Sequence, residues 1–66
     1  SMEGLKMTEK EMIKMTIEEF ERLQDYMIST EKDSESYRKM KRRYIALKVI
    51  LTSSGINLTE LDFIKE

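Results

Sequence analysis

The sequence predicts an all-α protein, a small helical hairpin or bundle of two main antiparallel helices with short helices at its N- and C-terminal ends. Two observations support this class. Between Thr8 and Ser54 there is neither proline nor glycine, the residues that most often interrupt a helix. In the same stretch apolar residues recur every three or four positions, which places them on one face of a helix. Residues 44–51 have strand propensity but lack the alternation of a half-buried strand.

The chain begins with two helix-start signals. Residues 1–6 are expected to form a disordered tail in which Ser1 is a cloning remnant, ahead of a single helical domain over 7–66. Thr8 precedes Glu11 and Thr16 precedes Glu19, and both pairs have the spacing of a capping box. They predict a short helix over 9–15 and a new helix over 17–29. One unbroken helix is the alternative, since an internal Thr costs less than ~1 kcal/mol.

The two main helices are marked by apolar stripes. The first stripe is Ile17, Phe20, Leu23 and Met27, and the second, over the predicted helix 34–54, is Tyr37, Met40, Tyr44, Leu47 and Leu51. Asp33 or Ser34 is expected to cap the second helix. Gly55 is expected to end it in the left-handed conformation of a Schellman motif. A weaker capping signal at Thr59 predicts a short terminal helix over 59–65.

The composition restricts the chemistry. The chain contains no Cys and no His, so it has no thiolate nucleophile, no disulfide and none of the usual ligands for zinc, copper or haem. A catalytic site would have to be built from Glu and Lys side chains in a deep pocket, which a few short helices rarely form. We therefore expect no enzyme activity, no catalytic residues, no cofactor and no metal site.

The size of the chain favours a partner subunit. A chain of 66 residues buries a small core, and domains below roughly 70 to 80 residues usually add a disulfide, a metal or a partner. With the first two excluded, we expect dimerisation to complete the fold. No apolar run is long enough to span a bilayer and no basic-then-apolar leader is present, so a cytoplasmic protein is expected.

Charge is distributed unevenly along the chain. Residues 1–36 carry 5 bases and 10 acids, residues 37–54 carry 6 bases and no acid, and residues 55–66 carry 1 base and 3 acids. The first interpretation is intramolecular, with acidic segments pairing with the basic helix. The alternative is contact with nucleic acid or an acidic partner through a basic cluster, which we define as Arg38, Lys39, Lys41, Arg42 and Arg43.

The second half of the basic helix is apolar on almost every side. Ile45 and Val49 lie away from the predicted core stripe, and a two-helix hairpin alone would leave them in water. These observations predict a protein-protein interaction or regulatory module that self-associates as a homodimer, and that binds no membrane and no small-molecule substrate. The expected interface residues are Ile45, Val49, Ile50, Leu58 and Phe63.

Residues 47–66 superficially resemble the turn and second helix of a helix-turn-helix, as in MerR-like regulators. The resemblance covers a helix stop at Gly55 and a helix start at Thr59. The segment that would read DNA carries Glu60, Asp62 and Glu66 against a single Lys65, and the given sequence ends before base-reading residues could follow. No family is assigned on this basis.

Overall fold

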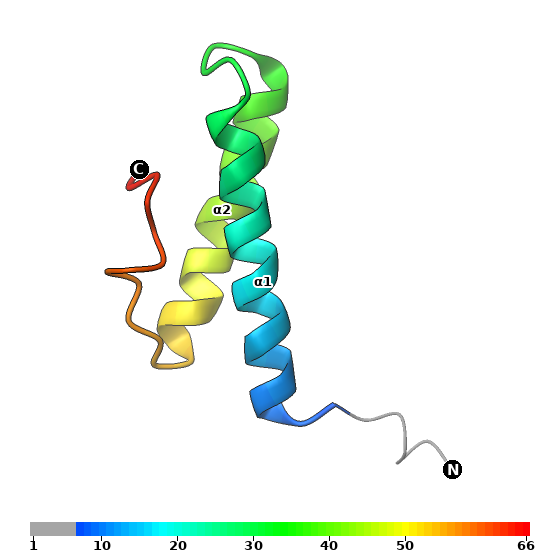
Figure 1. Cartoon of the computed structure of the whole chain (residues 1–66), viewed down its shortest axis with the longest axis vertical. Helices are drawn as coiled ribbons and strands as arrows, with labels where there is room; N and C mark the ends of the chain where they lie inside the picture. The colour runs from blue at the N-terminus through cyan, green and yellow to red at the C-terminus, as the bar shows by residue number, and fades with distance from the viewer. Residues whose placement is uncertain (1–6) are drawn as a thin grey trace.

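The computed structural model describes residues 7–66, and the predicted tail over 1–6 lies outside these residues. Two antiparallel helices, α1 (Glu9–Ile28) and α2 (Glu35–Ser53), form a hairpin, and the chain after α2 turns and runs back beside it (Figure 1). The predicted helical hairpin is therefore confirmed. Within residues 7–66, no helix is both long enough and apolar enough to cross a membrane.

The first capping box forms as predicted, but the second does not. Thr8 Oγ1 accepts a hydrogen bond from the Glu11 backbone N–H at 3.1 Å, and the Glu11 carboxylate accepts from the Thr8 N–H at 3.2 Å. Thr16 lies inside α1, and its hydroxyl donates to the Met12 carbonyl at 2.9 Å. The predicted helices 9–15 and 17–29 are thus one helix. A break would leave backbone groups of the central turns without partners, which costs more than an internal Thr.

The predicted limits of the second helix are confirmed. Ser34 is the N-cap and accepts from the Tyr37 N–H at 3.0 Å. At the other end the Ile56 N–H donates to Leu51 and the Gly55 N–H donates to Thr52, both at 3.0 Å, which is the bond pattern of a Schellman motif. Gly55 has a φ of 81°, a conformation that favours glycine.

The predicted helix over 59–65 does not form. The N–H groups of Leu61 and Asp62 both donate to the Leu58 carbonyl, which makes a single turn. The later N–H groups, from Phe63 to Glu66, donate instead to side chains of Gln24, Asp62 and Tyr44. Since these side-chain acceptors replace the carbonyls that a helix would use, the segment stays irregular.

The core lies between the two helices. Phe20 and Tyr44 stack at its centre, with ring centroids 5.6 Å apart and an interplanar angle of 12°. Partly buried residues of the C-terminal segment, including Ile56, Leu58 and Leu61, pack against this core. The fully enclosed apolar side chains come from the two predicted stripes: Phe20, Met27, Tyr37, Tyr44, Leu47 and Leu51.

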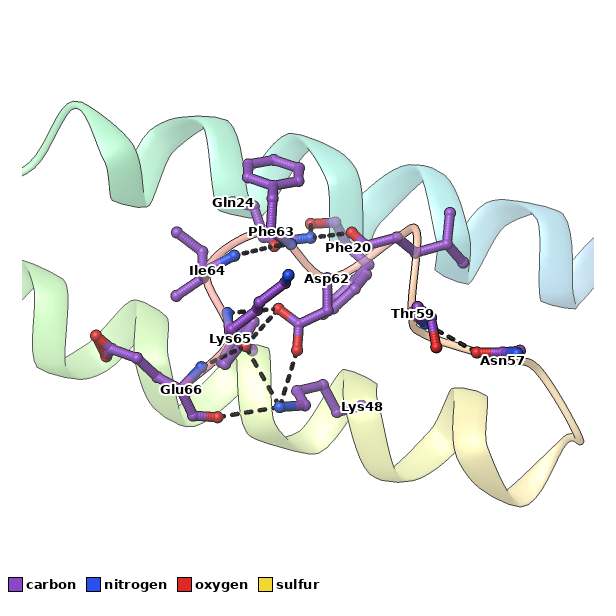
Figure 2. A network of polar contacts seen from close by, with 12 residues as sticks. Phe20, Gln24, Lys48, Asn57, Thr59, Asp62, Phe63, Ile64, Lys65 and Glu66 are labelled. Carbon is purple, nitrogen blue, oxygen red and sulfur yellow. Dashed lines mark hydrogen bonds and ion pairs between the residues drawn. The ribbon is translucent and has the colours of Figure 1, made fainter.

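The hairpin has two broad faces. Successive residues of a helix are rotated by about 100°, so Gln24 lies about 40° around α1 from Phe20, and Lys48 lies about 40° around α2 from Tyr44. Both residues are on the same side of the hairpin, and both contact the C-terminal segment (Figure 2). Glu19 and Arg43 lie about 100° to the other side, where their ion pair joins the two helices. We call this second side, which the C-terminal segment does not cover, the open face.

Candidate functional site

A buried amide holds the C-terminal segment against the hairpin. Gln24 has no exposed surface, and its Nε2 donates to the Leu61 carbonyl at 2.9 Å. Its Oε1 accepts from the backbone N–H groups of Phe63 at 2.9 Å and Ile64 at 3.0 Å (Figure 2). One side chain on α1 therefore satisfies three backbone groups of a segment almost 40 residues later in the chain.

Tyr44, Lys48 and Asp62 form a second polar cluster between α2 and the C-terminal segment. The Tyr44 hydroxyl donates to Asp62 Oδ1 at 2.6 Å and accepts from the Glu66 N–H at 3.0 Å. Lys48 Nζ lies 3.0 Å from Asp62 Oδ2 and 4.9 Å from the centre of the Tyr44 ring. The Lys48 ammonium also donates to the Glu66 carbonyl at 3.0 Å. The cluster therefore ties residues 62–66 to α2.

These contacts shift the pKa of each member of the cluster. Burial raises the pKa of the Tyr44 phenol, and its hydrogen bond to Asp62 raises it further. Burial also acts to raise the pKa of Asp62, but hydrogen bonds from Tyr44, the Lys65 N–H and Lys48 outweigh it, and the net shift is downward. The pKa of Lys48 is raised, chiefly by its hydrogen bond to Asp62. Each group is thus held in the protonation state it has at neutral pH.

The buried groups of the polar cluster are all bonded within the chain. Within residues 7–66, every buried side-chain nitrogen and oxygen has a hydrogen-bond partner. Over the same residues, no group of three or more acidic side chains is arranged to hold a metal ion. A closed network of this kind rigidifies the chain that it joins. The network holds the C-terminal segment in place on the hairpin.

The basic cluster is largely paired within the chain. Arg43 contacts the Glu19 carboxylate with two hydrogen bonds, at 2.9 and 3.1 Å. Lys41 lies 3.2 Å from Glu66. Among residues 7–66, the remaining contacts of the cluster are local or absent. Arg38 donates to the Asp33 carbonyl, Lys39 pairs with Glu35 at 3.5 Å, and Arg42 makes no ion pair or hydrogen bond.

These contacts favour the intramolecular interpretation of the charge distribution. Acidic residues of α1 and of the C-terminal segment neutralise the inner side of the basic helix, as the pairs of Glu19 and Glu66 show. Arg38, Lys39 and Arg42 line an open hollow with Glu35 on the outer side of α2. The five cations therefore do not form one patch.

The expected interface residues are divided between several surfaces. Ile45 and Val49 are exposed on the outer side of α2, where they line an open hollow that Lys48 and Glu66 also border. Ile50 is exposed at the edge of the open face, about 120° from the core side of α2. Two further residues lie on the C-terminal segment. Phe63 is exposed there, whereas Leu58 packs against the core and is partly used within the chain.

Two residues that join parts of the molecule, Gln24 and Glu19, were not predicted from the sequence. Gln24 stands between Phe20 and Met27 at intervals of four and three, so its place on the apolar stripe was a signal. The sequence predicts that Glu19 completes a capping box with Thr16, whereas its carboxylate contacts Arg43 on the other helix. No family model, no curated protein and no solved structure matches this chain.

Proposed function

We propose that this protein is a small, non-enzymatic protein-protein interaction or regulatory module that self-associates through an apolar helix surface. The observation that carries the proposal is the exposure of Ile45, Val49 and Ile50 in the C-terminal half of α2. The C-terminal segment covers neither the outer side of α2, where Ile45 and Val49 lie, nor the edge of the open face, where Ile50 lies. Met12, Met15 and Tyr26 of α1 are exposed on the side toward which Ile50 lies, and an exposed apolar patch on a small protein marks an interface.

The polar clusters support a binding role over a catalytic one. Hydrogen bonds that hold the C-terminal segment use the polar groups of Gln24, Tyr44 and Asp62. A general acid or base needs an accessible group within reach of a substrate, and these groups are enclosed by their own partners. The hollows on the surface are open. Of the two most apolar, one is lined by α1 alone and the other by α2 with Glu66 at its border.

Sedimentation equilibrium tests the proposal. We expect the wild-type chain to form dimers at about 100 µM, a concentration at which weak interfaces are populated. A clean monomer at that concentration would contradict self-association. A matched pair of measurements at low and high salt separates an apolar interface, which salt leaves intact or strengthens, from an electrostatic one, which salt weakens.

The alternative function is nucleic-acid binding through the outer cations of α2. It is favoured by one observation, namely that Arg38, Lys39 and Arg42 share an exposed side on which Arg42 has no acidic partner among residues 7–66. The test is binding to duplex DNA or an RNA hairpin over a salt series, with Arg38→Glu/Arg42→Glu as the variant. Binding that weakens steeply with salt and is lost in this variant would support it. Far-ultraviolet circular dichroism shows whether the variant is folded.

A further inference from the structure

We propose that the partner is a second copy of this chain, docked on the open face so that two hairpins form a four-helix bundle. This inference rests on the proposed self-association and specifies its surface and its symmetry: Ile50 lies in the contact, and Ile45 and Val49 lie outside it. The open face, marked by the Glu19–Arg43 pair, lies on the side of the hairpin away from Gln24 and Lys48, which hold the C-terminal segment.

Apolar residues flank a central ion pair on this face. The stacked Phe20–Tyr44 pair and the Glu19–Arg43 pair set which residues of the two helices lie at the same level. On one side of the ion pair, Met12 and Met15 of α1 lie near the level of Ile50 of α2, and all three are about half exposed. On its other side lie the partly buried Leu23 and Met40 and the exposed Tyr26.

The charges select one of the two ways in which these faces can meet with two-fold symmetry. An axis perpendicular to the helices at the level of the central ion pair places α1 on the partner's α1, so that Glu19 meets Glu19 and Arg43 meets Arg43. An axis parallel to the helices places α1 on the partner's α2. Each Glu19 then faces an arginine of the other copy, and the four charges alternate in sign. Like charges in contact cost several kcal/mol at an interface, so the parallel axis is favoured.

The same arrangement matches apolar surfaces. With the axis parallel to the helices, Met12 lies over the partner's Ile50, and Leu23 lies over the partner's Met40. Every neighbouring pair of helices is then antiparallel, as in up-and-down four-helix bundles. Flexible methionine side chains fill the irregular gaps of such an interface well.

The open face is large enough for a stable dimer. Helices of 20 and 19 residues lying side by side give a face roughly 30 Å long and 20 Å wide. Because side chains make the accessible area of this face larger than that of a flat rectangle, it is comparable to the ~800 Å² that each partner contributes to a standard interface. The contact would also add a second layer to a molecule whose shortest dimension is 15 Å.

Two neighbouring substitutions on α2 test which surface is used. Ile50→Lys places a charge on the open face, and Val49→Lys places the same charge on the outer side of the same turn. We expect Ile50→Lys to raise the dimer dissociation constant about tenfold or more, as loss of an apolar anchor does. Val49→Lys should change it less than about twofold. Both side chains are exposed, 45% for Ile50 and 61% for Val49, so both variants should keep the wild-type circular dichroism.

The outcomes separate this inference from the function on which it rests. A wild-type chain that stays monomeric overturns the proposed self-association and the bundle together. A wild-type dimer that Val49→Lys disrupts and Ile50→Lys leaves intact overturns the open-face bundle alone. In that case the module still self-associates, through the outer side of α2.

Cysteine cross-linking tests the symmetry, because the chain has no cysteine of its own. Chains with Met12→Cys are mixed with chains with Ile50→Cys and oxidised mildly. With the axis parallel to the helices, the mixture should give a disulfide-linked dimer. A mixture of Met12→Cys and Tyr26→Cys chains should give it only if the axis is perpendicular and passes at the level of the ion pair. Efficient linkage in the second mixture and none in the first would overturn the proposed arrangement.

Discussion

Gln24 supplies the backbone partners that regular secondary structure would otherwise give to the C-terminal segment. Its amide has one acceptor oxygen and two N–H groups, and the oxygen accepts both the Phe63 and the Ile64 N–H. A polar residue inside an apolar stripe normally destabilises a core. Here it is fully bonded, and it fixes the position of residues 61–64 relative to α1.

Replacing this amide should release the segment. Gln24→Leu keeps a similar volume but leaves the Phe63 and Ile64 N–H groups and the Leu61 carbonyl without their partner. We expect a loss of about 2–3 kcal/mol in the free energy of unfolding. Amide hydrogen exchange at residues 63 and 64 should become faster than in the wild type. Glu21→Leu, an exposed site on the same helix, is the control, and unchanged exchange at 63 and 64 in Gln24→Leu would contradict this role.

Elements with local signals were predictable, and those that depend on distant residues were not. The capping residues Thr8 and Ser34 and the Gly55 stop lie within a few residues of the groups they bond, so the sequence shows them. The irregular course of residues 62–66 depends on Gln24 and Tyr44, which are far away in sequence. The capping pattern at Thr59 depends only on residues close to it in sequence, so it could not indicate these distant contacts.

Thr16 gives a test in which the sign of the effect decides between one helix and two. Because Thr16 lies inside α1, Thr16→Ala should raise the free energy of unfolding by about 0.3–0.6 kcal/mol through helix propensity. If Thr16 instead capped a new helix, the same change would lower it by about 1 kcal/mol. Urea unfolding of the two proteins distinguishes these results. Thr8→Ala, which removes the cap that the structure contains, is the control and should be destabilising.

Gly55 ends α2 because of its backbone conformation. A Cβ at this position would meet no heavy atom within 4 Å, so the cost of a substitution comes from the positive φ alone. We expect Gly55→Ala to lower the free energy of unfolding by about 1 kcal/mol. Gly55→Asn should cost less, because Asn tolerates the left-handed region. Equal losses for Ala and Asn in thermal unfolding would show that the left-handed conformation is not the cause.

At the scale of the molecule, the sequence predicted the hairpin and the excess of apolar surface on α2, but not how the surface is divided. Ile45 and Val49 were expected to lie in water without a further partner, and they are exposed. Which broad face stays uncovered depends on where the C-terminal segment docks, and this is set by Gln24, Tyr44 and Lys48. The open face could therefore be recognised only once these contacts were known.

The pairing of acidic residues across the molecule predicts that stability falls at low pH. Hydrogen bonds with Thr8 lower the pKa of Glu11, Arg43 lowers that of Glu19, and Lys41 lowers that of Glu66. The pKa of Asp62 is also lowered, by bonds that outweigh its burial. A carboxylate with a depressed folded-state pKa stabilises the fold fully above its unfolded-state pKa, which is 3.8 for Asp and 4.5 for Glu. That contribution is lost as the pH falls through the depressed values.

The substitution Asp62→Asn removes the contribution of Asp62, a buried carboxylate whose pKa is lowered. The variant loses the ion pair with Lys48 and weakens the bond with Tyr44, so its free energy of unfolding at neutral pH should be about 1–3 kcal/mol below that of the wild type. Because Asn does not titrate, the decline of its stability between about pH 5 and pH 2 should be shallower, and the two curves should converge in acid. Urea unfolding at several pH values measures both. Glu60→Gln, whose side chain makes no contact with a cation among residues 7–66, should follow the wild-type curve. Parallel curves for Asp62→Asn and the wild type would mean that Asp62 does not hold the C-terminal segment through its charge.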